Sequence, residues 1–351
     1  MAAPQHLTCL CGLVKEPASL LASSEGPFEG SICHCDTCRH TTGALGTWYA
    51  TLKRSPSEES LSHTTAYKTS SKYTRFFCKQ CGCHVFVRSE RDGRWLACAG
   101  IVETDIRRVE GETKEGRLDN VARVTFHEYV GDAHDGGIAP YMTRLGGRTV
   151  PCFLTEPDDG AEPMPENELQ RLRTKGLNEA SQGRSEYLPV ACHCGGVQLH
   201  IVPPAYDQGQ KDWYVPSDRS KYYARFCCCR SCRLTLGFSM QPWTYIPPGQ
   251  ILTAQEEPVI FGPKAKDAVQ IAGLKHYQSS EFVLRSFCTT CGATIFYQSF
   301  ERPYIIDVSV GVVRSAIGNA LAGEWLQWDR SMVSKRNEAV DNELVDAWLK
   351  A

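Results

Sequence analysis

Fourteen of the eighteen cysteines in this 351-residue chain fall into three motifs that occur twice in the same order. The first motif is Cys-x-Cys-Gly, the second is Cys-x-Cys-x-x-Cys-Arg, and the third is Phe-Cys-x-x-Cys-Gly. The motifs hold Cys9 and Cys11, then Cys33, Cys35 and Cys38, then Cys78 and Cys81, and again Cys192 and Cys194, then Cys227, Cys229 and Cys232, then Cys288 and Cys291. Three matched motifs predict two tandem metal-binding units, copy one and copy two.

The first and third motifs together provide four thiolates, the usual ligand set of a closed structural zinc. We assign one zinc to Cys9, Cys11, Cys78 and Cys81, and a second to Cys192, Cys194, Cys288 and Cys291. The two pairs of each set lie far apart in the sequence, so the metal would join the ends of the unit and folding would depend on it.

The middle motif provides only three thiolates, and a zinc with three protein ligands keeps a position for water or substrate. Three thiolates leave the centre anionic, which favours holding a substrate thiolate over activating water. The alternative is a structural site completed by a distant histidine, a carboxylate or the spare cysteine. His34 and Arg39 are candidates for orienting the ligands or pairing with an acidic substrate. In copy two, Cys228 replaces His34 and could be a ligand or a redox thiol. The count is two to four zincs per chain: four if both copies are intact, and two if the three-cysteine sites are empty.

Short segments rich in Val, Ile, Phe and Tyr predict strands around these sites, and hence a mainly β protein. The expected order is a first zinc-binding β domain (1–145), an exposed linker rich in proline and acidic residues (146–186), a second zinc-binding β domain (187–336) and a C-terminal helix (337–351). A short helix is expected at 166–177 within the linker. Matched glycines, Gly43 and Gly237, are followed by tryptophans Trp48 and Trp243, which we pair as equivalents. The C-terminal helix would cover a sheet edge or the other domain with Val340, Leu344, Val345, Trp348 and Leu349.

Composition limits the partners. A formal net charge of −2 argues against a large basic face, so nucleic acid is not an expected partner. No apolar run is long enough to span a bilayer, and Met1 to Cys9 lacks the pattern of a secretory signal. We therefore expect a cytoplasmic protein with reduced thiols and no membrane partner.

With these motifs the chain resembles the glutathione-dependent formaldehyde-activating enzyme (GFA) family, which includes centromere protein V. Copy one matches every element of the family pattern, and copy two matches all but the histidine, which is Cys228. The resemblance covers about residues 5–144 and 187–335. It implies two Mss4-like domains, a structural four-cysteine zinc, a three-cysteine zinc that takes the substrate thiol, and glutathione as a co-substrate.

A further segment, from Phe126 to Gly137, is similar to the end of the domain in some family members. It would place His127, Asp132 and His134 on a loop that could lie near the site. Copy two lacks its Asp-Gly-Gly, so copy one is the better candidate for chemistry.

Two functions follow. The first is a carbon–sulfur lyase-like enzyme acting on a small-molecule thiol adduct or a specialised metabolite, with a nearby His or Asp moving the proton. The second is a non-catalytic, zinc-stabilised binding or scaffold protein of the centromere protein V type. The catalytic candidates are Cys33, Cys35, Cys38, His34, Arg39, His127, Asp132 and His134. The sequence does not predict the oligomeric state.

Overall fold

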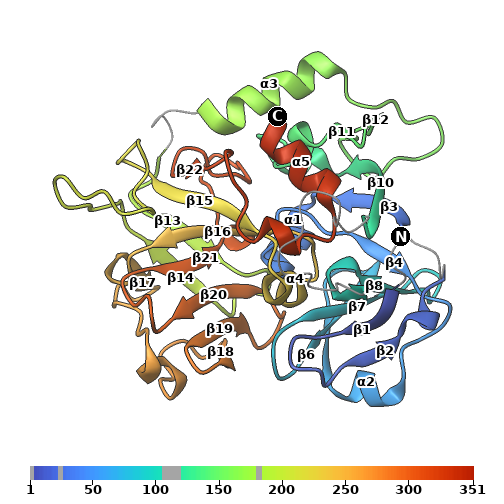
Figure 1. Cartoon of the computed structure of the whole chain (residues 1–351), viewed down its shortest axis with the longest axis horizontal. Coiled ribbons are helices and arrows are strands. Elements are labelled where there is room, and N and C mark those ends of the chain that lie inside the picture. Colours follow the sequence, from blue (N-terminus) through green and yellow to red (C-terminus); the bar gives the residue numbers. More distant parts are fainter. Residues whose placement is uncertain (1–3, 23–26, 105–119, 179–183) are drawn as a thin grey trace.

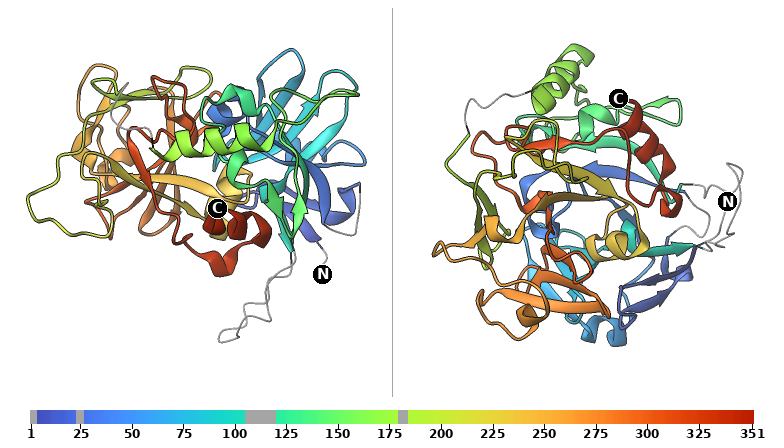
Figure 2. Two further views of the ribbon diagram at one scale, coloured as in Figure 1. Left: turned by 90° about the horizontal axis from the view of Figure 1, so that it is seen from above. Right: turned by 60° about the vertical axis from the view of Figure 1, so that its left-hand side comes forward.

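The computed structural model describes residues 4–22, 27–104, 120–178 and 184–351. Strands predominate, as the sequence predicted, and the cysteine clusters are compatible with Mss4-like zinc-binding domains. In Figures 1 and 2 the strands of copy one lie on one side and those of copy two on the other. Helices α1 and α4 lie between them (Figure 1).

Copy one begins with short strands whose apolar residues alternate toward the core. Its strands are β1 (Pro4–Thr8), β2 (Lys15–Pro17), β3 (Phe28–Cys33), β4 (Tyr49–Thr51), β5 (Thr64–Lys68), β6 (Tyr73–Cys78), β7 (His84–Ser89), β8 (Trp95–Cys98), β9 (Val102–Thr104) and β10 (Ala122–Glu128). A small hairpin of β11 (Arg144–Leu145) and β12 (Arg148–Thr149) follows.

Copy two has a similar series of strands. These are β13 (Leu188–Ala191), β14 (Gln198–Ile201), β15 (Tyr222–Cys227), β16 (Gln241–Ile246), β17 (Ile251–Thr253), β18 (Leu274–Ser280), β19 (Val283–Cys288), β20 (Thr294–Ser299), β21 (Ile306–Ser309) and β22 (Leu326–Trp328). The described α-helices are α1 (Asp36–Thr42), α2 (Glu58–Ser62), α3 (Glu166–Asn178), α4 (Arg230–Leu236) and α5 (Asn342–Lys350).

The main sheets of the two copies have the same strand order. Copy two has one seven-stranded sheet, β18-β19-β20-β21-β16-β15-β22. Copy one has β5-β6-β7-β8-β4 and a separate parallel pair, β3-β10, joined to the first sheet by an isolated bridge between Cys33 and Thr47. The shared order agrees with a tandem repeat, while the exact domain boundaries stay a prediction.

Strand register corrects one expected equivalence. Tyr49 pairs with Cys98 in copy one, and Trp243 pairs with Ser309 in copy two. Cys98 and Ser309 each precede a matching 3-10 turn, η2 (Ala99–Ile101) or η8 (Val310–Val312). Trp243 therefore corresponds to Tyr49, and pairing it with Trp48 was wrong by one residue. A shift of one residue places a side chain on the opposite face of a strand.

The two copies meet through reciprocal backbone contacts. Helix α1 ends at Gly43 and packs on η8 of copy two, and α4 ends at Gly237 and packs on η2 of copy one. The Gly311 amide donates to the Gly43 carbonyl at 3.0 Å, and the Gly100 amide donates to the Gly237 carbonyl at 3.0 Å. Each contact needs glycine, because a Cβ on Gly311 or Gly100 would lie 2.2 or 2.4 Å from the opposite backbone.

The segment predicted as an exposed linker is partly built into the fold. Cys152, Met164 and Leu169 are buried. The Phe153 amide donates to the His127 carbonyl at 2.8 Å, and the His127 amide donates to the Pro151 carbonyl at the same distance. The prediction that this segment is exposed is wrong here, because its backbone forms hydrogen bonds with the N–H and C=O groups of His127 near the end of β10. The predicted helix at 166–177 is present as α3.

The C-terminal helix α5 begins at Asn342, five residues later than predicted. Before it, the Val340 carbonyl accepts from the Val121 amide at 3.0 Å, and the Asp341 carboxylate accepts from the Ala122 amide at 2.7 Å. Because this pairing holds Val340 and Asp341 outside the helix, α5 begins only at the next residue. Trp348 then packs edge-to-face on Tyr141 and on aromatic rings of copy two, so α5 contacts both copies.

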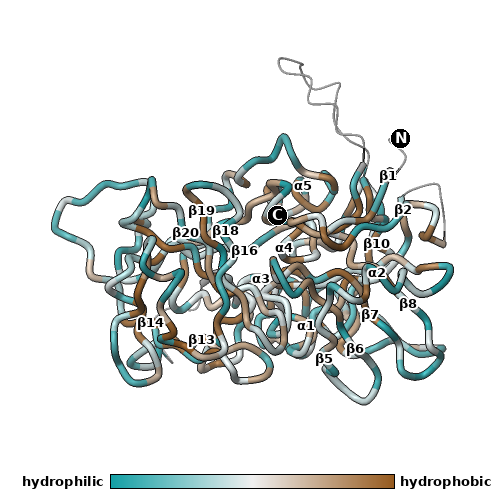
Figure 3. Tube along the Cα trace, turned by 90° about the horizontal axis from the view of Figure 1, so that it is seen from below, coloured by the Kyte–Doolittle hydropathy of each residue, from teal (hydrophilic) through white to brown (hydrophobic). Residues whose placement is uncertain are grey.

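Hydrophobic residues follow the strands of both copies, and hydrophilic ones predominate in the outer loops (Figure 3). Most buried apolar side chains form a single cluster that includes residues of both copies. In the described ranges, no helix has the length and apolar character needed to cross a membrane.

The glycine contact between the copies is directly testable. We expect Gly311→Ala to lower the free energy of unfolding by at least about 1–3 kcal/mol, because its Cβ overlaps the Gly43 backbone. Urea unfolding followed by fluorescence measures the change. The matched control is Gly249→Ala, where a Cβ meets nothing within 4 Å. Equal stability of both variants would show that the copies do not depend on this approach.

Candidate metal centres

The four-cysteine cluster of copy one joins the loop after β1 to the end of β6. The Sγ atoms of Cys9 and Cys11 lie 3.4 Å apart, and those of Cys11 and Cys78 lie 3.6 Å apart. All four ligand atoms, including that of Cys81, lie within 4.8 Å of one another. A tetrahedron with zinc–sulfur bonds of about 2.3 Å has edges of about 3.8 Å, so the residues fit a zinc.

The same cluster forms in copy two. The Sγ atom of Cys194 lies 3.5 Å from those of Cys192 and Cys288, and Cys291 completes the group. Amide groups also face the sulfurs, since the Val197 amide donates to Cys192 Sγ at 3.3 Å. In copy one the Val14 amide donates to Cys9 Sγ at the same distance. Such donors stabilise thiolates, which agrees with metal ligation.

The three-cysteine cluster of copy one is built at the start of α1. Cys33 ends β3, Cys35 caps the helix, and Cys38 lies in its first turn. The Cys38 amide donates to Cys35 Sγ at 3.3 Å, and the Sγ atoms of Cys38 and Cys33 lie 3.4 Å apart. Hydrogen bonds from the neighbouring Cys33 and Cys35, together with the Arg75 charge, hold the pKa of Cys38 well below its usual value.

Copy two repeats this arrangement with Cys227, Cys229 and Cys232 around the start of α4. Among the described residues, neither three-cysteine cluster gathers a histidine or carboxylate as a fourth ligand. Cys228 is not part of the cluster, and its burial raises the pKa of its thiol. Three cysteines therefore converge at each of these clusters, Cys228 is not among them, and its raised pKa does not favour a redox-active thiolate.

His34 lies in the core instead of facing a substrate. Its Nε2 lies 2.9 Å from His127 Nδ1, and its Nδ1 lies 3.3 Å from the Leu45 carbonyl oxygen. His127 Nε2 lies 3.1 Å from the Met142 carbonyl oxygen. Both rings are fully buried, and burial lowers the pKa of each. His127 is thus in β10, and its predicted place on a loop was wrong.

The other predicted polar candidates have mainly structural contacts. Arg39 donates through Nε to the His34 carbonyl at 3.1 Å and pairs with Asp36, which supports the cysteine loop. Asp132 accepts from the Asp36 amide at 3.1 Å, so it lies at the first turn of α1. His134 Nδ1 lies 2.7 Å from the Ile317 carbonyl oxygen of copy two. Of these three, Arg39 belongs to α1, which begins at the cluster, and Asp132 lies beside the first turn of that helix.

The sequence reasoning missed an arginine at each three-cysteine centre. Arg75 Nη2 donates to Cys38 Sγ at 2.9 Å, while Nη1 contacts the Tyr49 hydroxyl. Arg285 Nη1 lies 3.8 Å from Cys232 Sγ, and Nη2 donates to Ser231 Oγ at 2.9 Å. A signal was present, since each arginine lies three residues before the first cysteine of the third motif.

Glu128 was missed as well. It is the parallel ladder partner of Cys33, and paired residues of adjacent strands point to the same face. Its Oε1 accepts from Ser31 Oγ at 2.9 Å. Burial raises the pKa of Glu128 to about 7, and the nearby Cys38 adds to this effect. The next residue, Tyr129, adopts a left-handed backbone conformation, which is uncommon for a bulky residue.

The two copies differ at three positions of this region, those of His34, His127 and Glu128. The His34 amide donates to the Glu128 carbonyl, and in copy two the Cys228 amide donates to the Ser334 carbonyl. Ser334 therefore corresponds to Glu128, and Val333 corresponds to His127. The replacement of His34 by Cys228 thus accompanies the loss of its histidine partner and of the carboxylate.

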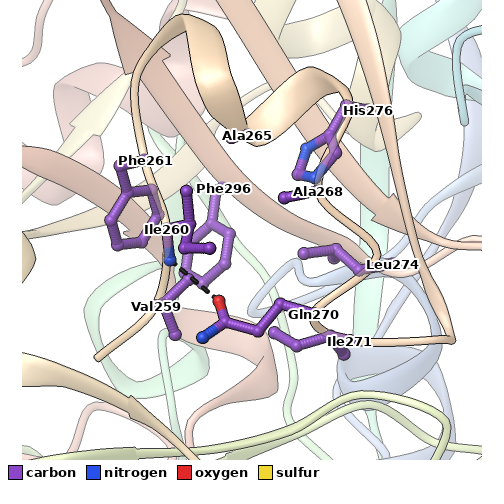
Figure 4. A pocket seen from close by; sticks show the side chains of 10 residues that line it. All are labelled: Val259, Ile260, Phe261, Ala265, Ala268, Gln270, Ile271, Leu274, His276 and Phe296. Atoms are coloured by element: carbon purple, nitrogen blue, oxygen red, sulfur yellow. Dashed lines mark hydrogen bonds between the residues drawn. The ribbon is translucent and has the colours of Figure 1, made fainter. Parts of the chain in front are cut away.

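The hollow drawn in Figure 4 does not serve these centres. Its lining is mostly apolar, and within it the Ile260 amide donates to Gln270 Oε1 at 2.8 Å. Its volume is about 10 Å³, which holds at most one water. No cysteine lines it, so the chemistry must be sought at the sulfur clusters.

Comparisons with known proteins agree with part of this description. Residues 4–114 match the sequence profile of the family described as "Glutathione-dependent formaldehyde-activating enzyme". A crystal structure of a Rhodobacter sphaeroides protein is 20% identical over 40% of this chain and 99% of that chain, with a TM-score of 0.25. At that score the likeness carries no argument. None of the curated proteins compared matches the chain significantly.

The four clusters predict the metal content of the purified protein. We expect four zincs per chain, three in the Cys35→Ser variant and three in Cys81→Ser. Elemental analysis by mass spectrometry against protein concentration measures them. Chelation should also unfold the protein, because the four-cysteine sets join distant segments. Two zincs per chain would contradict metal binding at the three-cysteine clusters.

The histidine pair predicts a structural effect without metal loss. We expect His127→Leu to cost about 1–3 kcal/mol of unfolding free energy, because His34 Nε2 loses its buried partner. The zinc content should stay the same. Urea unfolding and elemental analysis test both points, with His63→Leu, a half-buried histidine elsewhere, as the control. A lost zinc with unchanged stability would instead make His127 a metal ligand.

Proposed function

Because residues 4–114 form a domain of the glutathione-dependent formaldehyde-activating enzyme family, we propose that this protein is a carbon–sulfur lyase-like enzyme. Its substrate would be a thiol adduct of the glutathione type or a specialised small metabolite. The observation that carries the proposal is the set of Cys33, Cys35 and Cys38, three converging thiols without a fourth protein ligand among the described residues.

The chain's own residues suit this chemistry. A zinc held by the three thiols would supply a position for a substrate sulfur. Capping of α1 by Cys35 and the bond from Arg75 to Cys38 fix the sulfur atoms in place. The Glu128 carboxylate, on the same face as Cys33, is positioned to hold or move a proton at Oε1 or Oε2 when an adduct forms or breaks.

Copy one is the better candidate for catalysis. Its cluster is accompanied by the Glu128 carboxylate and its partner Ser31, whereas a buried arginine, Arg75 or Arg285, lies at the cluster of each copy. In copy two, Cys227 and Cys232 belong to an apolar cluster with Tyr214, Trp243 and Tyr245. The carboxylate is replaced by Ser334, so copy two lacks the same proton carrier. We infer that copy two holds metal but differs in substrate or has no catalytic role.

The scaffold function remains the second candidate, and one observation favours it. His34, His127 and Arg39, which the sequence suggested for catalysis, all make buried structural contacts. If copy one were also only structural, the protein would be a zinc-stabilised binding module. The enzyme proposal is preferred because Glu128 and the open cysteine set lie together.

Replacing Cys35 tests the enzyme proposal. We expect Cys35→Ser to fold, to lose one zinc and to lose adduct turnover by at least about 100-fold, since a ligand of the open centre is gone. NMR exchange between glutathione, formaldehyde and their adduct is the measurement. Glu128→Gln should keep its zinc and lose about 100- to 10,000-fold in rate.

The matched control is Cys152→Ser, which changes a buried thiol outside the clusters. It should keep four zincs and the parent's activity. A Cys35→Ser variant that loses one zinc yet retains every activity of the parent would show that copy one is not catalytic.

A further inference from the structure

Two buried arginines have no carboxylate partner. Arg75 and Arg285 are 4% and 3% exposed, and neither forms an ion pair with Asp or Glu in the described part of the chain. The fully buried Arg233 differs, because its Nη2 lies 3.1 Å from Glu103 Oε2. A buried guanidinium without a counter-charge is costly, so these two arginines need another anion.

The three-cysteine clusters supply the anions that these arginines contact, since the buried Asp307, which is within electrostatic range of Arg285, is ion-paired with Arg302. Arg75 donates to Cys38 Sγ at 2.9 Å, and its remaining contact is the Tyr49 hydroxyl. Arg285 lies 3.8 to 3.9 Å from Cys232 Sγ and 4.8 Å from the centre of the Tyr297 ring. Three thiolates around a divalent cation carry a net charge of −1, and one arginine neutralises it.

Strand geometry makes this arrangement a repeated feature of the fold. Arg75 lies on β6 and Arg285 on β19, each three residues before a cysteine of the four-cysteine cluster. The strand whose end is fixed by the structural cluster therefore delivers the arginine to the open cluster. Both sites depend on one strand in each copy.

We propose that Arg75 and Arg285 are the counter-ions of the two three-cysteine centres and that Arg75 makes the fourth position of copy one selective for an anionic sulfur ligand. The selectivity rests on the proposed function, whereas the counter-ion role does not. A fourth thiolate would bring the zinc centre to −2, and Arg75 reduces this to −1. The charge of Arg75 does not stabilise a bound neutral ligand to a comparable degree. The longer distance of Arg285 makes its effect weaker.

The first experiment measures metal affinity and does not depend on substrate. In a Cys229→Ser background, which removes the other open centre, we compare Arg75→Gln, Arg75→Lys and Arg88→Gln by zinc competition with a chromophoric chelator. Arg88 is a matched surface arginine paired with Glu90. We expect Arg75→Gln to raise the dissociation constant of the most weakly bound zinc by at least about tenfold. The reason is that an opposite charge at this range changes the pKa of an anionic group by about one to three, and a change of one corresponds to a tenfold change in an equilibrium constant. Arg75→Lys should recover much of the loss, and Arg88→Gln should match the parent.

The second experiment uses cobalt in place of zinc and glutathione as the probe. Glutathione should increase the sulfur-to-cobalt absorption of the parent, and Arg75→Gln should need at least about tenfold more of it. S-methylglutathione, which cannot form a thiolate, should have no effect on any variant. If Arg75→Gln and the parent needed the same glutathione concentration to reach half of the absorption change, the proposed selectivity would be overturned. A parent that does not respond to glutathione would refute thiol binding, while the zinc competition would still decide the counter-ion role.

A double-mutant cycle covers the case in which Arg75→Gln folds poorly. The cycle compares the urea midpoint change caused by Arg75→Gln in the parent with the change in a Cys38→Ser background. A counter-ion predicts a large loss in the parent and a small one when Cys38 is absent, because the partner charge has gone. An equal loss in both backgrounds would make Arg75 a packing residue and overturn the proposal.

Discussion

Sulfur atoms gathered at 3.4 to 3.6 Å are the constraint on which the rest of this structure depends. Thiolates at such distances repel one another unless a cation lies between them, so each cluster favours binding of a metal ion. In copy one the four-cysteine cluster brings together Cys11 and Cys78, which lie 67 residues apart in the sequence. The strand that ends at Cys78 also carries Arg75 to the three-cysteine cluster, so the four-cysteine cluster fixes the strand on which Arg75 lies.

The two copies behave as one unit. Both four-cysteine clusters lie beside the other copy. The Tyr67 hydroxyl lies 2.7 Å from Nδ1 of His193, the residue between Cys192 and Cys194. Conversely, the pKa of Tyr277 in copy two is raised to about 12 by burial and by the cysteines of copy one. Together with the glycine contacts at Gly43 and Gly237, these contacts place both four-cysteine clusters at the interface between the copies.

Divergence between the copies is concentrated where the chemistry would occur. The frame is kept, since each copy has the same strand order in its main sheet, one four-cysteine cluster, one three-cysteine cluster and a buried arginine beside the latter. What changes is the set of side chains around the open cluster: Glu128 is replaced by Ser334, and the His34–His127 pair by Cys228 and Val333. A fold of this kind can keep its metal frame while one copy acquires an aromatic surround with Tyr214 and Tyr245.

The sequence by itself determined the sulfur groups, because Cys-x-Cys and Cys-x-x-Cys spacings limit which thiols can meet, and every predicted group converges within 4.8 Å. It also determined the mainly β character and the helix α3. Only the tertiary structure decided which other side chains reach the clusters. Arg75 and Glu128 reach the three-cysteine cluster of copy one from strands β6 and β10, and strand pairing, with its exact register, sets their direction. Strand pairing also makes Trp243 the equivalent of Tyr49, delays α5 to Asn342 and buries Cys152 in the segment that the composition predicted to be an exposed linker. Local spacing fixes ligands that are neighbours in sequence, whereas partners supplied by distant strands depend on a pairing that no short motif records.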